Sequence, residues 1–505
     1  MWLEDCLNDL YEAGVQNPNL ALIYAANSKN KVAIKTPSGL TDRVEIDNIV
    51  MQGEVMAPLE CSVSVDTFGK ECQKEEKFLY SYKGIVGVPS LSMVDDEINI
   101  SECGIESVAL NAYMNAKSNT KKFQFGKEKC HKLHIGGKID NCPELYIDTW
   151  KIETKEEFDT GRTTLTDVTD DEHKIELSED EKYLCDLISS DGKNLKNMKA
   201  RKAKGIGIIN QINSFLNDVF FGPYYFQVAL MLRTTKFLNS ILLNSESWYN
   251  LTNADIQELE TVDNMLLRQI LECGKSTPTS ILHLELGTIP VRYVIKSRRL
   301  MFLQYILKED NESLMHKFFS AQFKYPQKGD WVLQVSQDMK EVNLNLTLSE
   351  ISEMSIDSYR SLVNKAIKRS AFNWLLSEKN KPRGSSVPKG IQLKYHELKM
   401  QNYLLPNQMV IKQCKLLFSL RAQMTSVRCN FKNSYDDLTC PVCDNPTYQD
   451  TQSHILQCKI LIENENILAG NQILYSDLFS QDVSKLSVVT FLFEKLLEKR
   501  KRLLE

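Results

Sequence analysis

The chain has 505 residues, of which 42% are hydrophobic and 25% are charged, so it is long enough to hold several domains with cores of their own. It has no run of about eighteen apolar residues, and residues 1–30 lack a basic start followed by an apolar core, so we expect neither a membrane span nor secretion. The 13 cysteines are scattered within apolar patterns, which is typical of a reducing compartment, nucleus or cytoplasm, rather than of a disulfide framework.

The first part of the chain predicts short helices followed by strands. Apolar residues recur at helical spacing over residues 2–13, and a second helix is expected over 19–27. Residues 31–35 and 43–46 alternate between apolar and polar types, as two strands joined by a turn would. A further helix is expected to begin after Pro58.

Residues 91–100 predict a tight β-hairpin with two carboxylates at its tip. Apolar and polar residues alternate on both sides of Asp95 and Asp96, which is the pattern of two short strands. Adjacent carboxylates repel each other, and Mg²⁺ is a common compensating ion because it binds one or two carboxylates together with substrate phosphates. The alternative is a solvated Asp-Asp turn.

The next segments continue an α+β pattern. We predict an amphipathic helix marked by Ile105, Val108, Ala109, Ala112 and Ala116. Strands are expected over 123–125 and 130–135, and again within the acidic stretch that follows.

Charge changes sign near residue 193. Residues 151–192 hold 14 Asp or Glu against 5 Lys or Arg, whereas residues 193–236 hold eight basic residues and one acid. Tyr224, Tyr225 and Phe226 lie within the basic block, and a basic surface with aromatics suits a nucleic-acid backbone. The alternative is a solvated helix face. The densest group of candidate nucleic-acid-binding residues is Lys196, Lys199, Arg201, Lys202 and Lys204.

From this block to about residue 420 the chain predicts long helices. Leucine-rich periodic runs cover 256–271 and 298–307, and helix breakers stand at Pro278, Pro290 and Pro326. Residues 379–389 are rich in proline, glycine and serine and predict a linker.

A compact group of cysteines and a histidine predicts a metal site near the C-terminus. Two residues separate Cys440 from Cys443, ten separate Cys443 from His454, and three separate His454 from Cys458. A Cys-x₂-Cys turn presents two thiolates to one tetrahedral Zn²⁺, and the later pair completes the ligand set. The alternative is three buried thiols and an unrelated histidine.

Several of these motifs, in this order and spacing, resemble the palm of reverse transcriptases of LINE-type non-LTR retrotransposons. The resemblance is carried by Gln52-Gly53 with Ala57-Pro58, by Val94-Asp95-Asp96, by Phe123 to Cys130, and by Lys182-Tyr183-Leu184. It covers roughly residues 1–300, and a weaker similarity extends to the Cys/His group. Met93 stands where many relatives have an aromatic residue, and Cys185 stands where a glycine is usual.

The resemblance implies roles for these residues. Gln52, Gly53, Ala57 and Pro58 would underlie the incoming nucleotide and template. Asp95 and Asp96 would bind catalytic Mg²⁺, and Lys129 would protonate pyrophosphate as a general acid. Lys182, Tyr183 and Leu184 would form the primer grip. The implied partners are an RNA template, a DNA primer and its duplex, and a dNTP.

We therefore expect an α+β fold in which a truncated right-hand polymerase palm is followed by a mainly helical thumb and connector and a small zinc knuckle. The expected domains are a palm remnant (1–192), a thumb (193–300), a connector (301–430), a zinc knuckle (431–470) and a helical tail (471–505).

The expected activity is RNA-templated DNA synthesis by two-metal nucleotidyl transfer in the intact family. In that family another carboxylate strand precedes the helix that here begins at Trp2, so we expect half a metal site and no primer extension by this chain alone. We also expect no endonuclease, because nothing precedes the palm and the 47 residues after Cys458 are too few for one. The alternatives are a non-catalytic nucleic-acid-binding protein derived from such an element and a decayed product. The basic residues 499–502 predict either a nuclear signal or the end of an amphipathic helix.

Overall fold

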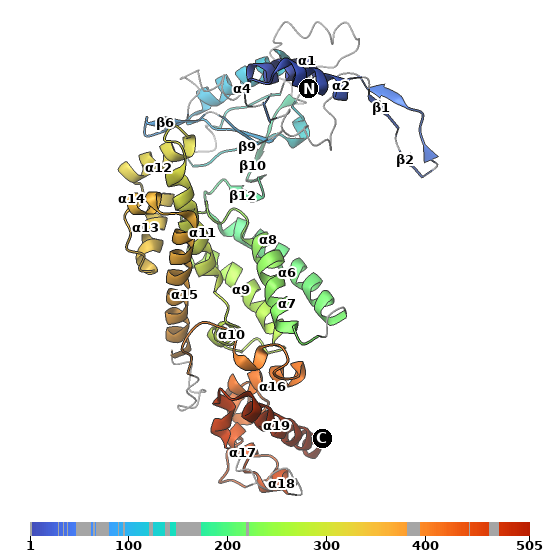
Figure 1. Ribbon diagram of the computed structural model, residues 1–505, viewed down its shortest axis with the longest axis vertical. Helices are drawn as coiled ribbons and strands as arrows, with labels where there is room; N and C mark the ends of the chain where they lie inside the picture. The colour runs from blue at the N-terminus through green and yellow to red at the C-terminus, as the bar shows by residue number, and fades with distance from the viewer. Residues whose placement is uncertain are drawn as a thin grey trace. The chain divides into compact units, whose positions relative to one another are not determined.

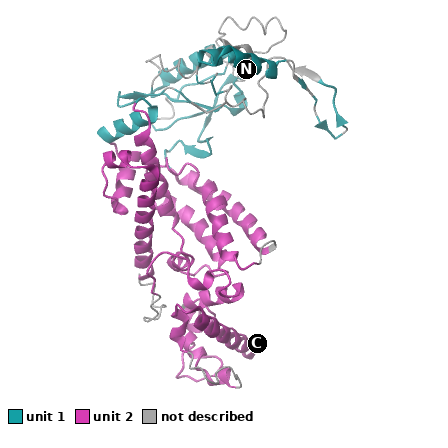
Figure 2. Ribbon diagram, in the orientation of Figure 1, with its two compact units in different colours: residues 1–193, 312–324 teal, residues 194–311, 325–505 magenta. Residues whose placement is uncertain are grey.

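The computed structural model describes residues 3–28, 30–33, 35–37, 39–46, 62–63, 66, 80–88, 90–93, 96–120, 125–136, 142–147, 173–218, 222–380, 394–443, 445–463 and 474–505. The chain divides into two compact units, which Figure 2 shows in different colours. The first comprises residues 1–193 and 312–324, and the second comprises residues 194–311 and 325–505. The domain order expected from the sequence did not assign residues 312–324 to the first unit.

The first unit combines short helices with small sheets (Figure 1). Its elements are α1 (Leu3–Glu12), α2 (Asn17–Asn27), β1 (Asn30–Val32), β2 (Lys35–Thr36), β3 (Gly39–Leu40), β4 (Val44–Ile46), β5 (Ser81–Tyr82), β6 (Val86–Gly87), β7 (Ser90–Met93), β8 (Asp96–Asn99), α4 (Gly104–Thr120), the 3₁₀-helix η2 (Lys127–Lys129), β9 (His131–Leu133), β10 (Glu176–Ser178), β11 (Asp180–Tyr183), β12 (Asp186–Ser189) and α12 (Leu314–Lys324). The described strands form two-stranded sheets, of which β9–β10 is parallel and the others are antiparallel.

Most of the elements predicted for the first unit and described here are confirmed. Helices α1 and α2 match the two expected helices, and β1 pairs with β4 as the alternation indicated. The hairpin over residues 91–100 is also confirmed, because β7 and β8 pair with Met93 opposite Asp96. The helix expected after Pro58 lies largely outside the described residues, as do positions 123 and 124.

The buried face of α4 was predicted wrongly. The helix exists, but Ile105 and Val108 point to solvent, with 84% and 46% of their surfaces exposed. The face that packs carries Leu110 and Met114 instead, together with the neighbouring Phe125. Large side chains on the opposite face bury more apolar surface than the alanines of the predicted face, and this burial sets the rotation of the helix.

The second unit is helical in its described part. Its elements are α6 (Leu195–Asp218), α7 (Tyr225–Leu232), the π-helix η5 (Arg233–Leu238), α8 (Asn239–Ile241), α9 (Asn253–Ile270), α10 (Thr279–Leu286), α11 (Val291–Lys308), α13 (Trp331–Glu341), α14 (Leu348–Glu353), α15 (Ile356–Asn380), η7 (Asn402–Leu404), α16 (Ile411–Arg421), η8 (Arg428–Ser434), α17 (Gln452–Ile455), α18 (Lys459–Ile462), η10 (Tyr475–Phe479) and α19 (Val483–Leu504). Pro278 and Pro290 stand directly before α10 and α11, so both predicted breakers mark helix starts.

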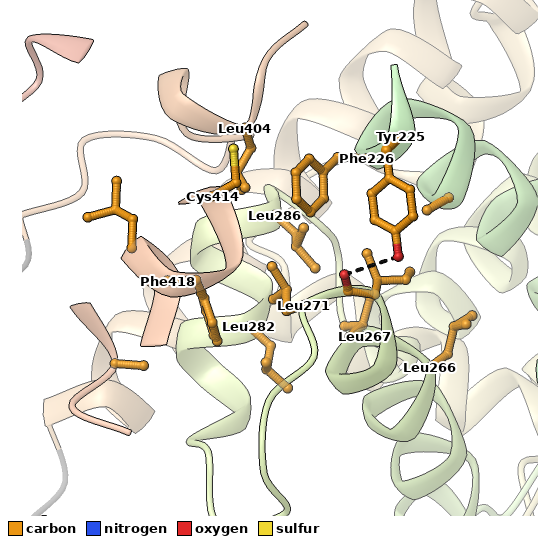
Figure 3. Close-up of a cluster of buried hydrophobic side chains, with 14 of the residues drawn as sticks. Tyr225, Phe226, Leu266, Leu267, Leu271, Leu282, Leu286, Leu404, Cys414 and Phe418 are labelled. Atoms are coloured by element: carbon orange, nitrogen blue, oxygen red, sulfur yellow. Dashed lines mark hydrogen bonds between the residues drawn. The ribbon is translucent and has the colours of Figure 1, made fainter. Parts of the chain in front are cut away.

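One apolar core runs through most of the second unit. It joins α6, α7, α9 and α10 to α16, α19 and the Cys/His segment. Figure 3 shows Phe226 and Leu286 beside Phe418 and Cys414 of α16, and it shows the bond that Tyr225 donates to the carbonyl of Ile270 at 3.4 Å. The C-terminal segment is therefore packed on the helical core.

A buried charge strengthens this packing. Glu285 of α10 is fully buried and accepts hydrogen bonds from Tyr395 Oη at 2.6 Å, Tyr403 Oη at 2.9 Å and Arg421 Nε at 3.0 Å. Three donors compensate the carboxylate for its lost hydration. This network connects α10 to α16 and to the residues between 394 and 405.

Mainly helical structure with small two-stranded sheets is broadly consistent with the expected α+β class. Within the described residues, no helix is long and apolar enough to cross a membrane.

Candidate functional site

The Cys/His group is held by a short hairpin and a capped helical turn. Thr439 and Gln449 form an isolated bridge, and the amide of Cys440 donates to the carbonyl of Tyr448 at 2.9 Å, so the Cys-x₂-Cys turn is presented by paired backbone. The hydroxyl of Thr451 accepts from the amide of His454 at 3.1 Å and caps α17. These local bonds bring the two halves of the motif together.

The four predicted ligand atoms converge on one point. One ligand atom from each of Cys440, Cys443, His454 and Cys458 lies within 4.8 Å of all the others. Tetrahedral zinc with Zn–S bonds of ~2.3 Å places its ligand atoms about 3.8 Å apart. Small movements of the four side chains would therefore bring their ligand atoms to the distances that zinc requires. His454 directs Nε2 toward Cys443, whose Sγ lies 3.4 Å away. The cluster can therefore hold a metal ion such as zinc.

The electrostatics of the cluster fit a metal that replaces protons. Burial lowers the pKa of His454, Asp450 opposes that shift, and the histidine is thus available as a neutral ligand. Burial and the nearby thiols of Cys440 and Cys443 raise the pKa of Cys458. Thiolates crowded in this way need a cation to balance them, and binding would release protons.

The carboxylate hairpin is described only in part. Asp95 lies outside the described residues, and Asp96 is exposed at the start of β8. Glu97 accepts a bond from Ser90 Oγ at 2.8 Å, and burial raises its pKa to about 7. Throughout the described ranges, the Cys/His group is the sole set of three or more cysteine, histidine or acidic side chains close enough to share an ion. The expected Mg²⁺ site consequently gains no support from the neighbours of Asp96.

The expected primer grip forms a second hairpin next to the first. Lys182 and Tyr183 end β11, and Tyr183 Oη donates a long bond of 3.5 Å to the carbonyl of Leu91 in β7. Burial raises the pKa of Tyr183, and Asp96 and Glu97 raise it further. The structure thus brings two motifs that are some ninety residues apart into contact.

The turn of this second hairpin places two non-glycine residues in left-handed backbone. Leu184 and Cys185 both have positive φ, of 45° and 72°, as a two-residue hairpin turn of the primed type requires. Glycine adopts such angles without strain, whereas cysteine does so at a cost. Cys185 therefore occupies a position where the backbone would favour glycine.

Lys129 ends the 3₁₀-helix η2 and is exposed. Its neighbour Cys130 is close enough to Glu97 for that carboxylate to add to the effect of burial in raising the pKa of the thiol. Gln52, Gly53, Ala57 and Pro58 lie outside the described residues.

The basic block requires a correction. Arg201 is only 4% exposed: its guanidinium donates to the carbonyl of Ile241 at 3.3 Å and lies 4.8 Å from the ring centre of Trp248. Lys202 binds Glu258 at 2.7 Å. Arg201 is in phase with the buried Met198 on a helix of 3.6 residues per turn, so it packs against the core and not against phosphates.

Three other lysines of α6 remain outward. Lys196, Lys199 and Lys204 are exposed, and the small exposed residues Ala200 and Ala203 lie between Lys199 and Lys204. The predicted basic surface is therefore narrower than the sequence indicated.

Basic side chains near the C-terminus bind other residues of the chain. Lys499 Nζ donates to the carbonyls of Leu461 at 2.9 Å and Glu463 at 2.8 Å, and the buried Arg500 donates to Asp450 at 2.7 Å. Of the two alternatives, the end of an amphipathic helix agrees with these contacts.

Sequence reasoning missed the residues around the Cys/His group. Asp450 is fully buried and accepts from the amide of Arg428 as well as from Arg500. Tyr448 is 47% exposed and stacks on His454 with ring centres 5.0 Å apart. The charge of Asp450 inside a cysteine motif was the available signal, since a buried carboxylate needs partners.

Comparison of the chain with protein-family models and with curated proteins returns no match.

Proposed function

We propose that this chain is a reverse-transcriptase domain protein of the LINE type that binds the duplex of RNA template and DNA primer through the outward face of α6. The observation that carries the proposal is the exposure of Lys196, Lys199 and Lys204 on one 24-residue helix. At 1.5 Å per residue this helix is about 36 Å long, close to one turn of a duplex.

The face is suited to contact with a nucleic-acid backbone. Ala200, Ala203 and Gly207 are exposed between and after the lysines, so a phosphate backbone can approach the helix closely while lysines neutralise it. Asn210 and Gln211 continue the face as hydrogen-bond donors. The acidic first unit would repel the same ligand.

The proposed metal of the C-terminal cluster is Zn²⁺, held by Cys440, Cys443, His454 and Cys458. Its role is structural, because four protein ligands leave no open position for a substrate. Next to it, Tyr448 and Tyr435 expose ring surfaces, with Arg428 lying 5.8 Å from the ring centre of Tyr435. Exposed rings with a cation offer stacking surfaces for unpaired bases.

Duplex binding is tested by fluorescence anisotropy with two RNA–DNA hybrids of equal length and unrelated sequence. We expect equal affinities that fall with salt, since each neutralised phosphate adds about −0.9 to the log–log slope. Failure to bind either hybrid, or binding that does not change with salt, would contradict the proposal.

A polymerase is the second candidate, and the contact between Tyr183 and the β7–β8 hairpin favours it. A primer grip must hold the primer end close to the metal-binding carboxylates, as this contact would allow. Extension of a primer on RNA with Mg²⁺ or Mn²⁺ that disappears in Asp95→Ala would support it. Duplex binding without extension would favour the non-catalytic alternative.

A further inference from the structure

Two buried polar atoms within residues 440–458 have no hydrogen-bond partner among the described residues. They are Nδ1 of His454 and Oδ1 of Asp450. Nη1 of Arg500, on the guanidinium that binds Asp450, is a third buried atom without a partner. Asp450 lies four residues before His454, at the base of the hairpin, and Thr451 caps α17 between them. One atom is an acceptor, and the other becomes a donor or an acceptor according to where the imidazole carries its proton.

The orientation of the His454 imidazole decides whether Nδ1 is a donor or an acceptor. Its Nε2 faces Cys443 Sγ at 3.4 Å, so the lone pair offered to a metal is on Nε2. A neutral imidazole that ligates through Nε2 carries its proton on Nδ1. Nδ1 is thus a buried donor in the metal-bound form, and it needs an acceptor.

Asp450 has the free capacity for this bond. Its Oδ2 is engaged by the amide of Arg428 and the guanidinium of Arg500, each at 2.7 Å, which holds the carboxylate in place and leaves Oδ1. Each carboxylate oxygen can accept two hydrogen bonds.

We propose that Asp450 is a positioning residue for the metal site: when the ion binds, its Oδ1 accepts a hydrogen bond from Nδ1–H of His454 and so fixes the tautomer and direction of that ligand. Ligating histidines commonly have such a partner, and its loss typically weakens metal affinity. Because Arg500 belongs to α19, the chain Arg500–Asp450–His454 would also connect the C-terminal helix to the ion. This inference rests on the proposed zinc site.

The test is a double-mutant cycle on the full chain, with Zn²⁺ affinity measured by competition against a chelator. We expect Asp450→Asn to weaken affinity by about 10- to 100-fold when His454 is present. In the His454→Cys background, which has no Nδ1, the same substitution should produce little or none of that loss. An equal loss in both backgrounds, or none in either, would overturn the assignment.

A second measurement needs no variant in the cluster. In zinc-loaded wild-type chain labelled with ¹⁵N-histidine, Nδ1 of His454 should carry a proton that exchanges slowly with water. A metal bound to Nδ1, or a proton that exchanges at the rate of a free imidazole, would overturn the role of Asp450. Wild-type chain that binds no zinc would overturn the proposed zinc site and this inference together.

Discussion

Helix α6 carries basic side chains on two faces, and the two faces differ in what surrounds the charge. On the inward face Arg201 is enclosed by Trp248, Asn197 and a backbone carbonyl. On the outward face Lys196, Lys199 and Lys204 are exposed. A buried cation must be satisfied by fixed partners and so contributes to a unique packing, whereas an exposed cation keeps its hydration and can exchange it for phosphates.

The inward charges extend beyond α6. Arg233, at the start of the π-helix η5, forms two bonds of 2.7 Å with Asp263 of α9 and a third of 3.0 Å with the carbonyl of Ile289. The eight basic residues of the block thus divide into buried or paired cations and exposed cations.

The largest effect is expected from Arg233→Met. This change leaves Asp263 as a buried charge without its partner, which typically costs about 3–5 kcal/mol of folding free energy. Chemical denaturation measures the loss. The double variant Arg233→Met with Asp263→Leu should recover most of it, and a single variant that loses less than about 1 kcal/mol would show that Arg233 belongs with the outward group.

Acid should destabilise the buried surroundings of His283, which lies in α10 near Arg233 and Asp263. Burial lowers the pKa of this histidine to about 4; Asp263 raises it by a smaller amount, and Arg233 lowers it further. The folded-state pKa is below the unfolded value of 6.5, so the contribution to stability is complete above pH 6.5 and is lost as pH falls toward 4. At 1.36 kcal/mol per pH unit the loss is about 3 kcal/mol.

The measurement is the free energy of unfolding between pH 7 and pH 4, in wild type and in His283→Gln. We expect a shallower dependence on pH in the variant, because it has no proton to bind at that position. Parallel curves would indicate that other groups cause the acid sensitivity.

Replacing each of two glycines of α6 by alanine should change the stability of the protein in opposite directions. A Cβ on the buried Gly205 would meet Val262 at 3.1 Å and Ile241 and Phe237 at 3.2 Å, so Gly205→Ala should destabilise by roughly 1 kcal/mol through overpacking. A Cβ on Gly207 meets nothing within 4 Å, so Gly207→Ala should stabilise by about 0.5–1 kcal/mol. Thermal unfolding of both variants tests the assignment of faces, and equal shifts would contradict it.

Local patterns predicted much of the structure because they depend on neighbours in sequence. The alternation around Asp96, the prolines before α10 and α11, and the spacing of the four metal ligands all act within short segments. The inward direction of Arg201 could also have been predicted from the sequence, because Arg201 falls on the same helical face as Met198 and Gly205. Its charge instead favoured the prediction of an exposed residue.

Other features depend on segments far apart in the chain. Glu285 finds its partners more than a hundred residues later, and Tyr183 meets a strand some ninety residues earlier. Single-segment patterns contain no information about such partners, so these contacts required the structure.

The central claim is that the outward lysines of α6 bind the nucleic-acid backbone. Its most direct test is a salt titration of hybrid-duplex binding with the triple variant Lys196→Glu, Lys199→Glu and Lys204→Glu. The matched control reverses three exposed lysines elsewhere, Lys328, Lys340 and Lys365, and so has the same net charge. The free energy of unfolding of both variants should lie within about 0.5 kcal/mol of the wild-type value, because none of the six side chains is buried.

We predict that the α6 variant binds more weakly than the control at every salt concentration, and that its log–log slope is shallower than that of wild type by up to about 2.7, the value for three phosphates on a duplex. An α6 variant whose affinity and slope equal those of the control would contradict the claim. Binding would then have to be assigned to another surface, with the exposed rings beside the Cys/His group as the next to test.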